Sequence, residues 1–267
     1  MRQCRTDERR RRQLRLTRVH VDAALGEGMI VELPSDASVH LARVLRARGG
    51  EDIVLFNGDG REFQGSITSV RGSRVHAAVG AAALVDRESP LALTLVQCVP
   101  RGDRMDFIVQ KATELGVKRI VPVLSQRSVV RLDERQSAAK SAHWRAVAAG
   151  ACEQCGRNRL PVIESPRPLL SYLGGPGTAL QADAAPPPVR LLLDPDAGAG
   201  AAIAHPAGGA DLAIGPEGGF GPDELEAFRL AGFTRISFGP RILRTETAAI
   251  AAVVWLQSLY GDLRRPV

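Results

Sequence analysis

A glycine-rich segment at residues 214–224 has the composition of a ligand-binding turn: Ile-Gly-Pro-Glu-Gly-Gly-Phe-Gly-Pro-Asp-Glu. It follows an apolar run typical of a buried strand, and Pro222 suits the first position of a helix. The glycines let backbone N–H groups approach a ligand closely, while Asp223 and Glu224 suit the positive end of the helix dipole. We expect a small molecule to bind at this strand-to-helix turn, although a purely structural turn has the same composition.

The same segment excludes the common nucleotide-binding loops. It lacks the Gly-Lys-Ser/Thr ending of a phosphate loop, and acidic side chains stand where they would repel phosphate oxygens. It also lacks the G-x-G-x-x-G pattern of a dinucleotide-binding turn. A ligand that combines an adenosine with an amino acid therefore fits better than a triphosphate.

A second polar segment, residues 238–248, reads Phe-Gly-Pro-Arg-Ile-Leu-Arg-Thr-Glu-Thr-Ala. It places Arg241 and Arg244 at the start of the last expected helix, for which Thr245 is the expected N-cap. Ligands of open α/β sheets bind at the carboxyl ends of the strands, so the two segments should form opposite walls of one pocket. Helix capping alone would explain the threonine but makes little use of the arginines.

Two further polar groups are less specific. A Glu-Gln-Cys-Gly-Arg-Asn-Arg run ends an expected helix, and its Arg157 and Arg159 either hold a phosphate or base edge or belong to a solvated surface. Lys111 lies on another expected helix with Arg104 and Glu114, at spacings that also permit ordinary surface ion pairs.

The elements that position these groups follow from the apolar pattern of residues 91–260. Short β-like runs alternate there with helical patterns, which predicts a mostly parallel α/β domain. The expected strands span 91–99, 119–124, 190–194, 211–215 and 235–239. The expected helices span 104–115, 136–155, 222–231 and 246–260, with a surface loop at 174–188.

The first part of the chain has a different pattern, with short β-like runs and glycine-rich turns. Asn57-Gly-Asp-Gly60 is a strong hairpin signal. The expected strands span 17–21, 29–33, 52–56, 62–67 and 74–79, with one helix at 38–46. These elements predict a small β-barrel ahead of the α/β domain.

The composition excludes several classes of protein. The 267 residues are 45% hydrophobic, and no run approaches the roughly 18 apolar residues of a membrane span. The four cysteines are too few and too unevenly placed for a secreted disulfide framework. Cys152 and Cys155 form a C-x-x-C, for which two small residues near a helix end, a redox pair and half a zinc site are the alternatives. We expect a cytoplasmic protein.

The positive charge is concentrated at the N-terminus. Residues 1–18 carry eight arginines against Asp7 and Glu8, a balance equal to the formal net charge of +6 of the whole chain. Such a tail either binds phosphates without sequence specificity or is a disordered appendage.

Five segments, in order and spacing from about residue 17 to 263, resemble the ribosomal RNA small subunit methyltransferase E family. They are His-Leu-Ala-Arg-Val-Leu-Arg at 40–46, Lys-Ala-Thr-Glu-Leu-Gly at 111–116, the run at 153–159, and the two polar segments at 214–220 and 239–248. The resemblance implies an α/β fold: a SPOUT domain with a C-terminal deep trefoil knot and a mostly parallel sheet, preceded by a small PUA-like β-barrel. The expected division is a basic tail at 1–16, a PUA-like RNA-binding domain at 17–83 and a SPOUT methyltransferase domain at 84–267.

The resemblance also implies a reaction, in which a homodimer transfers a methyl group from S-adenosyl-L-methionine to N3 of a uridine in 16S rRNA. The substrate is either the rRNA itself or the assembled small ribosomal subunit. The residues implied for cofactor binding are Leu193, Asp194, Pro195, Gly215, Pro216, Glu217, Gly218, Gly219, Gly239, Ile242, Leu243, Arg244, Thr245 and Thr247. Those assigned to RNA binding are Arg43, Arg46, Lys111, Arg157 and Arg159.

The chemistry of uridine N3 indicates what catalytic groups to expect. The nitrogen becomes nucleophilic only as its proton leaves, so a base and a cation beside the carbonyl oxygens would lower the barrier. The candidates are Arg241, Arg244, Glu246 and Glu217. One arginine would stabilise the uracil anion while a carboxylate or water takes the proton, and both carboxylates could instead bind backbone N–H groups. This mechanism requires no metal.

Two other classes of protein remain open. One is a non-enzymatic RNA-binding protein whose α/β domain only dimerises, and the other is a nucleotide-dependent oxidoreductase. The two intact polar segments count against the first, and the missing G-x-G-x-x-G pattern counts against the second.

Overall fold

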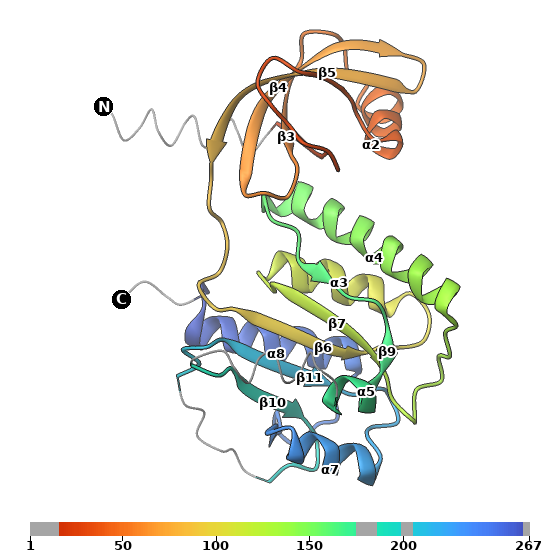
Figure 1. Cartoon of the computed structure of the whole chain (residues 1–267), viewed down its shortest axis with the longest axis vertical. Coiled ribbons are helices and arrows are strands. Elements are labelled where there is room, and N and C mark those ends of the chain that lie inside the picture. Colours follow the sequence, from red (N-terminus) through yellow and green to blue (C-terminus); the bar gives the residue numbers. More distant parts are fainter. Residues whose placement is uncertain (1–15, 175–185, 199–204, 264–267) are drawn as a thin grey trace. The chain divides into compact units, whose positions relative to one another are not determined.

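The structure is a computed structural model that describes residues 16–174, 186–198 and 205–263. Apart from its last residue, the expected basic tail at 1–16 lies outside the described residues, as does most of the expected surface loop at 174–188. The chain forms two compact units, which are described separately (Figure 1). The first unit comprises residues 1–88 and 149–160, and the second comprises residues 89–148 and 161–267.

The first unit is built on a five-stranded mixed sheet in the order β1-β3-β4-β5-β2. Only the β1–β3 pairing is parallel. The strands are β1 (Thr17–His20), β2 (Ile30–Glu32), β3 (Asp52–Phe56), β4 (Arg61–Arg71) and β5 (Arg74–Leu84). All five predicted strands and the hairpin at Asn57–Gly60 are confirmed, and β4 and β5 run on past the predicted ends as one long hairpin.

The predicted helix at 38–46 was wrong in its start and in its type. The structure has a short helix α2 (Ser35–Val39) that continues as a π-helix, η1 (His40–Val44). The amide of Leu45 donates to the carbonyl of His40 at 3.0 Å, and Arg46 follows with a left-handed φ of 53°. Apolar spacing over so few residues cannot distinguish an α-turn from the wider π-turn.

The second unit contains a seven-stranded sheet in which every pairing between its described strands is parallel. The order is β12-β10-β11-β6-β7-β8, and β9 also pairs with β7. The strands are β6 (Leu93–Cys98), β7 (Arg119–Leu124), β8 (Val162–Ile163), β9 (Arg167–Pro168), β10 (Val189–Leu193), β11 (Ala210–Ile214) and β12 (Thr234–Ile236). The predicted parallel α/β architecture is confirmed.

Five helices complete the described part of the second unit: α3 (Arg104–Glu114), α4 (Glu134–Cys155), α5 (Leu169–Gly174), α7 (Pro222–Leu230) and α8 (Thr245–Tyr260). The last seven residues of α4 belong to the first unit. The four predicted helices are confirmed to within two residues. The predicted N-cap of the last helix was wrong, because Arg244 occupies that position and Thr245 is the first helical residue.

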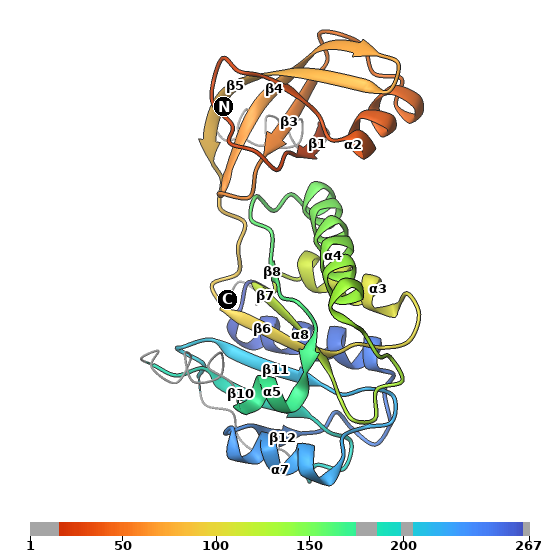
Figure 2. The same ribbon diagram turned by 45° about the vertical axis from the view of Figure 1, so that its right-hand side comes forward.

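The helices cover both faces of the parallel sheet (Figure 2). Leu93 and Leu95 of β6 pack in a cluster with residues of α3, α8 and the first part of α4. Val96 and Cys98, which point to the other face, pack with residues of α5 and α7. This alternation of fully buried residues is what a sheet covered on both faces requires.

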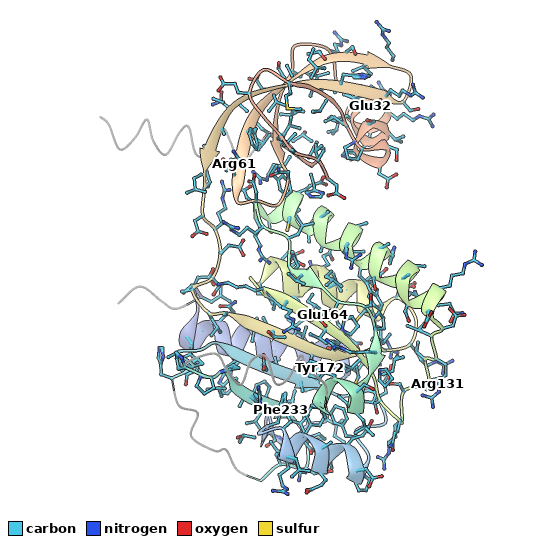
Figure 3. The ribbon with its side chains drawn as sticks, in the orientation of Figure 1. Glu32, Arg61, Arg131, Glu164, Tyr172 and Phe233 are labelled. Atoms are coloured by element: carbon cyan, nitrogen blue, oxygen red, sulfur yellow. The ribbon has the colours of Figure 1, made fainter. Side chains whose placement is uncertain are left out.

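The elements missed by the sequence analysis, β8, β9 and α5, are too short to show a period. Glu164 joins two of the neighbouring elements, because its carboxylate accepts hydrogen bonds from Arg119 of β7 and Arg167 of β9 (Figure 3). Along residues 16–174, 186–198 and 205–263, each helix is too short or too polar to cross a membrane.

Candidate active site

A cavity of about 460 Å³ opens at the carboxyl end of the parallel sheet of the second unit. Its walls come from the turns that follow β10, β11 and β12, from the start of α8, and from Arg127, which follows β7. The two polar segments singled out in the sequence therefore do line one cavity. Its position at the ends of adjacent strands is where parallel α/β sheets bind ligands.

Nearly all of the residues expected to bind a cofactor line this cavity, and Thr247 alone among them does not. Of the four expected catalytic residues, Arg241, Arg244 and Glu217 line it, whereas Glu246 does not. The apolar part of the wall includes Leu193, Ile214, Leu225, Phe238 and Leu243.

Glycine is favoured at two places in the turn after β11. Gly219 has a φ of 66°, and its amide donates to the carbonyl of Pro216 at 3.0 Å, which closes a tight turn. At Gly215, a Cβ would lie 3.0 Å from the ring of Phe220, so a larger residue would require that ring to move by a few tenths of an ångström. Both positions therefore favour the smallest residue next to the cavity.

Glu224 ties this turn to the segment after β7. Its fully buried carboxylate accepts hydrogen bonds from the amide of Gly221 at 2.9 Å, the amide of Gln126 at 2.8 Å and the hydroxyl of Ser125 at 3.0 Å. From the sequence, Glu224 was expected to favour the helix dipole of α7. The structure shows in addition that it anchors the segment that carries Arg127.

Thr245 joins two walls of the cavity. Its hydroxyl donates to the carbonyl of Gly215 at 2.8 Å and accepts from the side-chain amide of Gln97 at 2.9 Å. Gln97 is the fifth residue of β6 and is fully buried. The hydroxyl is engaged between the walls, so it makes no side-chain bond that caps α8.

The turn after β10 is held in a similar way. The carboxylate of Asp194 accepts from Arg235 of β12 at 2.7 Å and from the amide of Asp196 at 3.0 Å. Asp194 therefore lines the cavity while its charge is neutralised by a neighbouring strand.

The free cations of the cavity are Arg241 and Arg244. Both are exposed, and neither side chain makes a hydrogen bond or an ion pair within the described residues. Two other arginines that the sequence analysis did not assign to the site hold its turn. Arg127 donates to the carbonyl of Gly218 at 3.1 Å, and Arg104 donates to Glu217 at 2.5 Å.

In the first unit, the residues expected to bind RNA are placed differently from one another. Arg43 and Arg46 are exposed on and just after η1, and Arg159 is exposed beside Gly60. The side chain of Arg157 is only 4% exposed and donates to both carboxylate oxygens of Glu88, at 2.6 Å and 3.0 Å. A solvated surface is therefore the wrong interpretation for Arg157. Lys111, on α3 of the second unit, pairs with Glu114 at 2.8 Å, as the surface interpretation expected.

A buried carboxylate organises the same part of the first unit. Glu62 accepts from Arg18 at 2.9 Å and from Arg87 at 3.0 Å, and Asn158 hydrogen-bonds to Arg18. Burial by itself would raise the pKa of Glu62, but the hydrogen bonds and charges of Arg87 and Arg18 outweigh it and lower that pKa. Asn158 and Arg157 thus help to hold the first unit together.

The C-x-x-C forms the end of α4. Cys152 is buried, and its pKa is raised by the hydrogen bond with Cys155 and by burial. A reactive cysteine needs the opposite shift, because the thiolate is the nucleophile. Of the three alternatives for Cys152 and Cys155, the structure agrees with two small residues near a helix end.

Comparisons with known proteins match both units. The family model described as RNA methyltransferase domain matches residues 87–257, and the one described as RNA methyltransferase PUA domain matches residues 33–79. The ribosomal RNA small subunit methyltransferase E of Buchnera aphidicola is 29% identical over 260 residues, which cover 93% of this chain and 98% of the relative. That of Bacillus subtilis is 30% identical and covers 80% and 84%.

Solved structures agree with these relatives. The crystal structure of a ribosomal RNA small subunit methyltransferase E from Neisseria gonorrhoeae, bound to S-adenosyl methionine, is 37% identical and has a TM-score of 0.83. A putative methyltransferase from Legionella pneumophila, in complex with the same cofactor, is 36% identical and has a TM-score of 0.81. Each covers 93% of this chain, and 99% of each solved chain is covered. The chain therefore belongs to the ribosomal RNA small subunit methyltransferase E family and is an RNA methyltransferase.

Proposed function

We propose that this enzyme transfers a methyl group from S-adenosyl-L-methionine to N3 of a uridine in 16S rRNA. The observation that carries the proposal is the cavity of the second unit, which is lined by both the glycine-rich turn and the Arg-Ile-Leu-Arg-Thr run. The two solved relatives with this cofactor bound support the choice of methyl donor.

The cavity fits this cofactor. Its volume of about 460 Å³ lies within the usual range for small-molecule sites. The apolar side chains of Leu193, Phe238 and Leu243 suit a purine ring, and the glycines of the turn at 215–219 offer backbone N–H groups to polar atoms. Bound there, S-adenosyl-L-methionine supplies an electrophilic methyl group.

The protein's own part is to make N3 of uridine nucleophilic. Arg241 and Arg244 lie at the cavity wall with no ion-pair partner in the described parts of the chain, and either can stabilise the negative charge that develops on the uracil oxygens. Glu217 is the better placed of the two carboxylates to take the proton, because it lines the cavity and Glu246 does not. Alignment of N3 with the methyl group supplies much of the remaining rate. The proposal involves no metal.

The first unit is proposed to bind the RNA. Arg43, Arg46 and Arg159 are exposed there, and exposed arginines of this kind can bind the phosphates of RNA. Arg157 has a different part, because its charge is already paired with Glu88. The substrate is the 16S rRNA or the assembled small subunit.

Family membership also supports three finer features. We propose that the SPOUT domain, at about 84–267, contains a C-terminal deep trefoil knot, that the PUA-like barrel spans about 17–83, and that the enzyme works as a cytoplasmic homodimer. Light scattering of the purified protein tests the dimer directly, since a mass of one chain would contradict it.

Nucleoside mass spectrometry tests the reaction. The enzyme is incubated with the methyl donor and with small subunits that lack the modification, and naked 16S rRNA is treated in parallel. Appearance of 3-methyluridine is the expected result, and the two substrates show whether assembled structure is recognised. A methyl group on another nucleoside would contradict the proposed target atom.

Arg244→Ala tests the role of the free cation. We expect the rate of methyl transfer to fall about 100-fold, the cost of removing one group that stabilises transition-state charge, while affinity for adenosylhomocysteine falls much less. Single-turnover assays measure the rate of methyl transfer, and calorimetric titration measures the affinity for adenosylhomocysteine. Arg229→Ala, which removes an exposed arginine on α7, is the control. Unchanged turnover in Arg244→Ala would remove Arg244 from the mechanism.

A further inference from the structure

Arg104 bridges two carboxylates that come from different elements, and one of them lines the cavity. Its Nη1 lies 2.5 Å from Oε1 of Glu217, in the turn between β11 and α7. Its Nε lies 3.9 Å from Oε1 of Glu246, in the first turn of α8. Arg104 itself is the first residue of α3, and neither it nor Glu246 lines the cavity. One guanidinium therefore connects α3 with the glycine-rich turn and with the start of α8.

The charges favour this bridge. Within the described residues, Arg104 is the only cation paired with either carboxylate. The side chains of Arg104 and Glu217 are 42% and 39% exposed, so solvent screens their pair, whereas Glu246 is only 17% exposed and its Oε2 is buried without a hydrogen-bond partner among those residues. Without the arginine, both carboxylates would lose the cation that they share, and the loss matters most for the less exposed Glu246.

The turn that Arg104 contacts belongs to neither a helix nor a strand. Residues 215–219 lie between β11 and α7, and besides the bond from the Gly219 amide to the Pro216 carbonyl, contacts from other segments hold them. Arg127 holds the same turn through the carbonyl of Gly218. Arg104 follows β6 and Arg127 follows β7. The glycine-rich turn is therefore held by two segments that come earlier in the chain.

We propose that Arg104 is a positioning residue for methyl transfer: it fixes the turn at 215–219 and keeps the Glu217 carboxylate at the cavity wall. This inference rests on the proposed function of the cavity. It is more specific than an ordinary surface ion pair, of which Arg229 and Glu226 on α7 are an example at 2.6 Å. That pair joins two residues of one helix, whereas Arg104 of α3 joins the glycine-rich turn to the first turn of α8.

The test uses adenosylhomocysteine, because it lacks the sulfonium charge and its affinity reports the shape of the site more than the long-range field. We expect Arg104→Gln to raise the Kd for adenosylhomocysteine and the KM for the methyl donor about tenfold, a typical coupling between linked groups. Arg104→Lys should raise the Kd and the KM less than Arg104→Gln does, because lysine keeps the positive charge. It should not restore wild-type values, because an ammonium group cannot reach both carboxylates as a guanidinium does. Arg229→Gln, which breaks the ordinary pair, should stay within about twofold of the wild type.

A double variant separates positioning from general stability. If Arg104 acts through Glu217, the pair Arg104→Gln with Glu217→Gln should bind adenosylhomocysteine no worse than Arg104→Gln alone, because Glu217 has already lost its cation in the single variant. Additive losses in the double variant would overturn the proposal. A lower melting temperature with unchanged Kd, KM and kcat in Arg104→Gln would also overturn it.

The Kd for adenosylhomocysteine can be measured whether or not the enzyme methylates uridine N3, so the role of Arg104 and the proposed reaction can fail separately. Wild-type enzyme that binds adenosylhomocysteine but yields no 3-methyluridine would contradict the proposed target, and the tenfold change in Kd would still support the bridge. Wild-type turnover with no change in Arg104→Gln would leave the reaction in place and remove Arg104 from it.

Discussion

At the scale of single residues, one hydroxyl connects the two halves of the candidate site. Thr245 receives a hydrogen bond from buried Gln97 and passes one to the carbonyl of Gly215. The start of α8 and the start of the glycine-rich turn therefore keep a constant separation. Any ligand between these walls meets a site whose width is set before it arrives, which is how preorganised sites gain affinity.

Thr245→Val should test this connection. The substitution keeps the shape of the side chain but removes the acceptor of one N–H of the Gln97 amide, which retains its bond to the Cys98 carbonyl, and the donor to the Gly215 carbonyl, so the free energy of unfolding should fall by about 2 kcal/mol. The Kd for adenosylhomocysteine should rise as well. Thermal unfolding and calorimetric titration give the two values. Thr234→Val, at an exposed position of β12, is the matched control, and equal losses in both variants would contradict the assigned role.

Residue types predicted much of the cavity wall, because glycine and proline restrict the backbone directly. The turn at 215–219 and the run from Gly239 to Thr245 were expected to face each other, and both line the cavity. Arg104 and Arg127 were not assigned to it. Their role depends on which strand ends are neighbours in space, and the order β11-β6-β7 has no local signal in the sequence.

At the scale of elements, the buried Glu62 cluster stabilises the junction of β1, β4 and the end of α4. Removing a single partner from such a cluster leaves buried charges without compensation. Glu62→Gln should therefore lower the free energy of unfolding of the first unit by about 3 kcal/mol at neutral pH. Hydrogen exchange of the β4 amides measures this unit by itself. Glu226→Gln, in an exposed pair on α7, is the control and should leave it unchanged.

The same cluster predicts a dependence on pH. Because the pKa of Glu62 is lowered in the folded state, its contribution is present above the pKa of the unfolded chain and is lost as the pH falls through the folded value. Protection of the β4 amides should thus decline on acidification more steeply in the wild type than in Glu62→Gln. Parallel profiles in the two proteins would contradict this assignment.

Long elements were predictable and short ones were not. The strand at 119–124 was predicted to the residue, and α4 to within two residues, because their apolar patterns extend over several side chains. The π-turn at His40–Val44 and the strands β8 and β9 offer too few residues for any period to appear.

At the scale of the whole molecule, the basic N-terminal segment accounts for the formal net charge of +6. If it binds phosphates, deletion of residues 2–16 should weaken RNA binding about tenfold at low salt and little at high salt, because counterion release drives such binding. Filter binding across a salt series measures both limits. Equal affinity of the two proteins at low salt would identify the segment as an appendage.

The path of the chain between the two units has a consequence for how such enzymes can be rebuilt. Residues 149–160 belong to the first unit although the second unit has already begun, and within them Asn158 donates to the carbonyl of Val85 and hydrogen-bonds to Arg18. A fragment that ends at residue 88 would lack these partners of its own interior. The first unit therefore cannot be exchanged as a cassette at a single cut, and a functional chimera would have to transplant two separate stretches of sequence together.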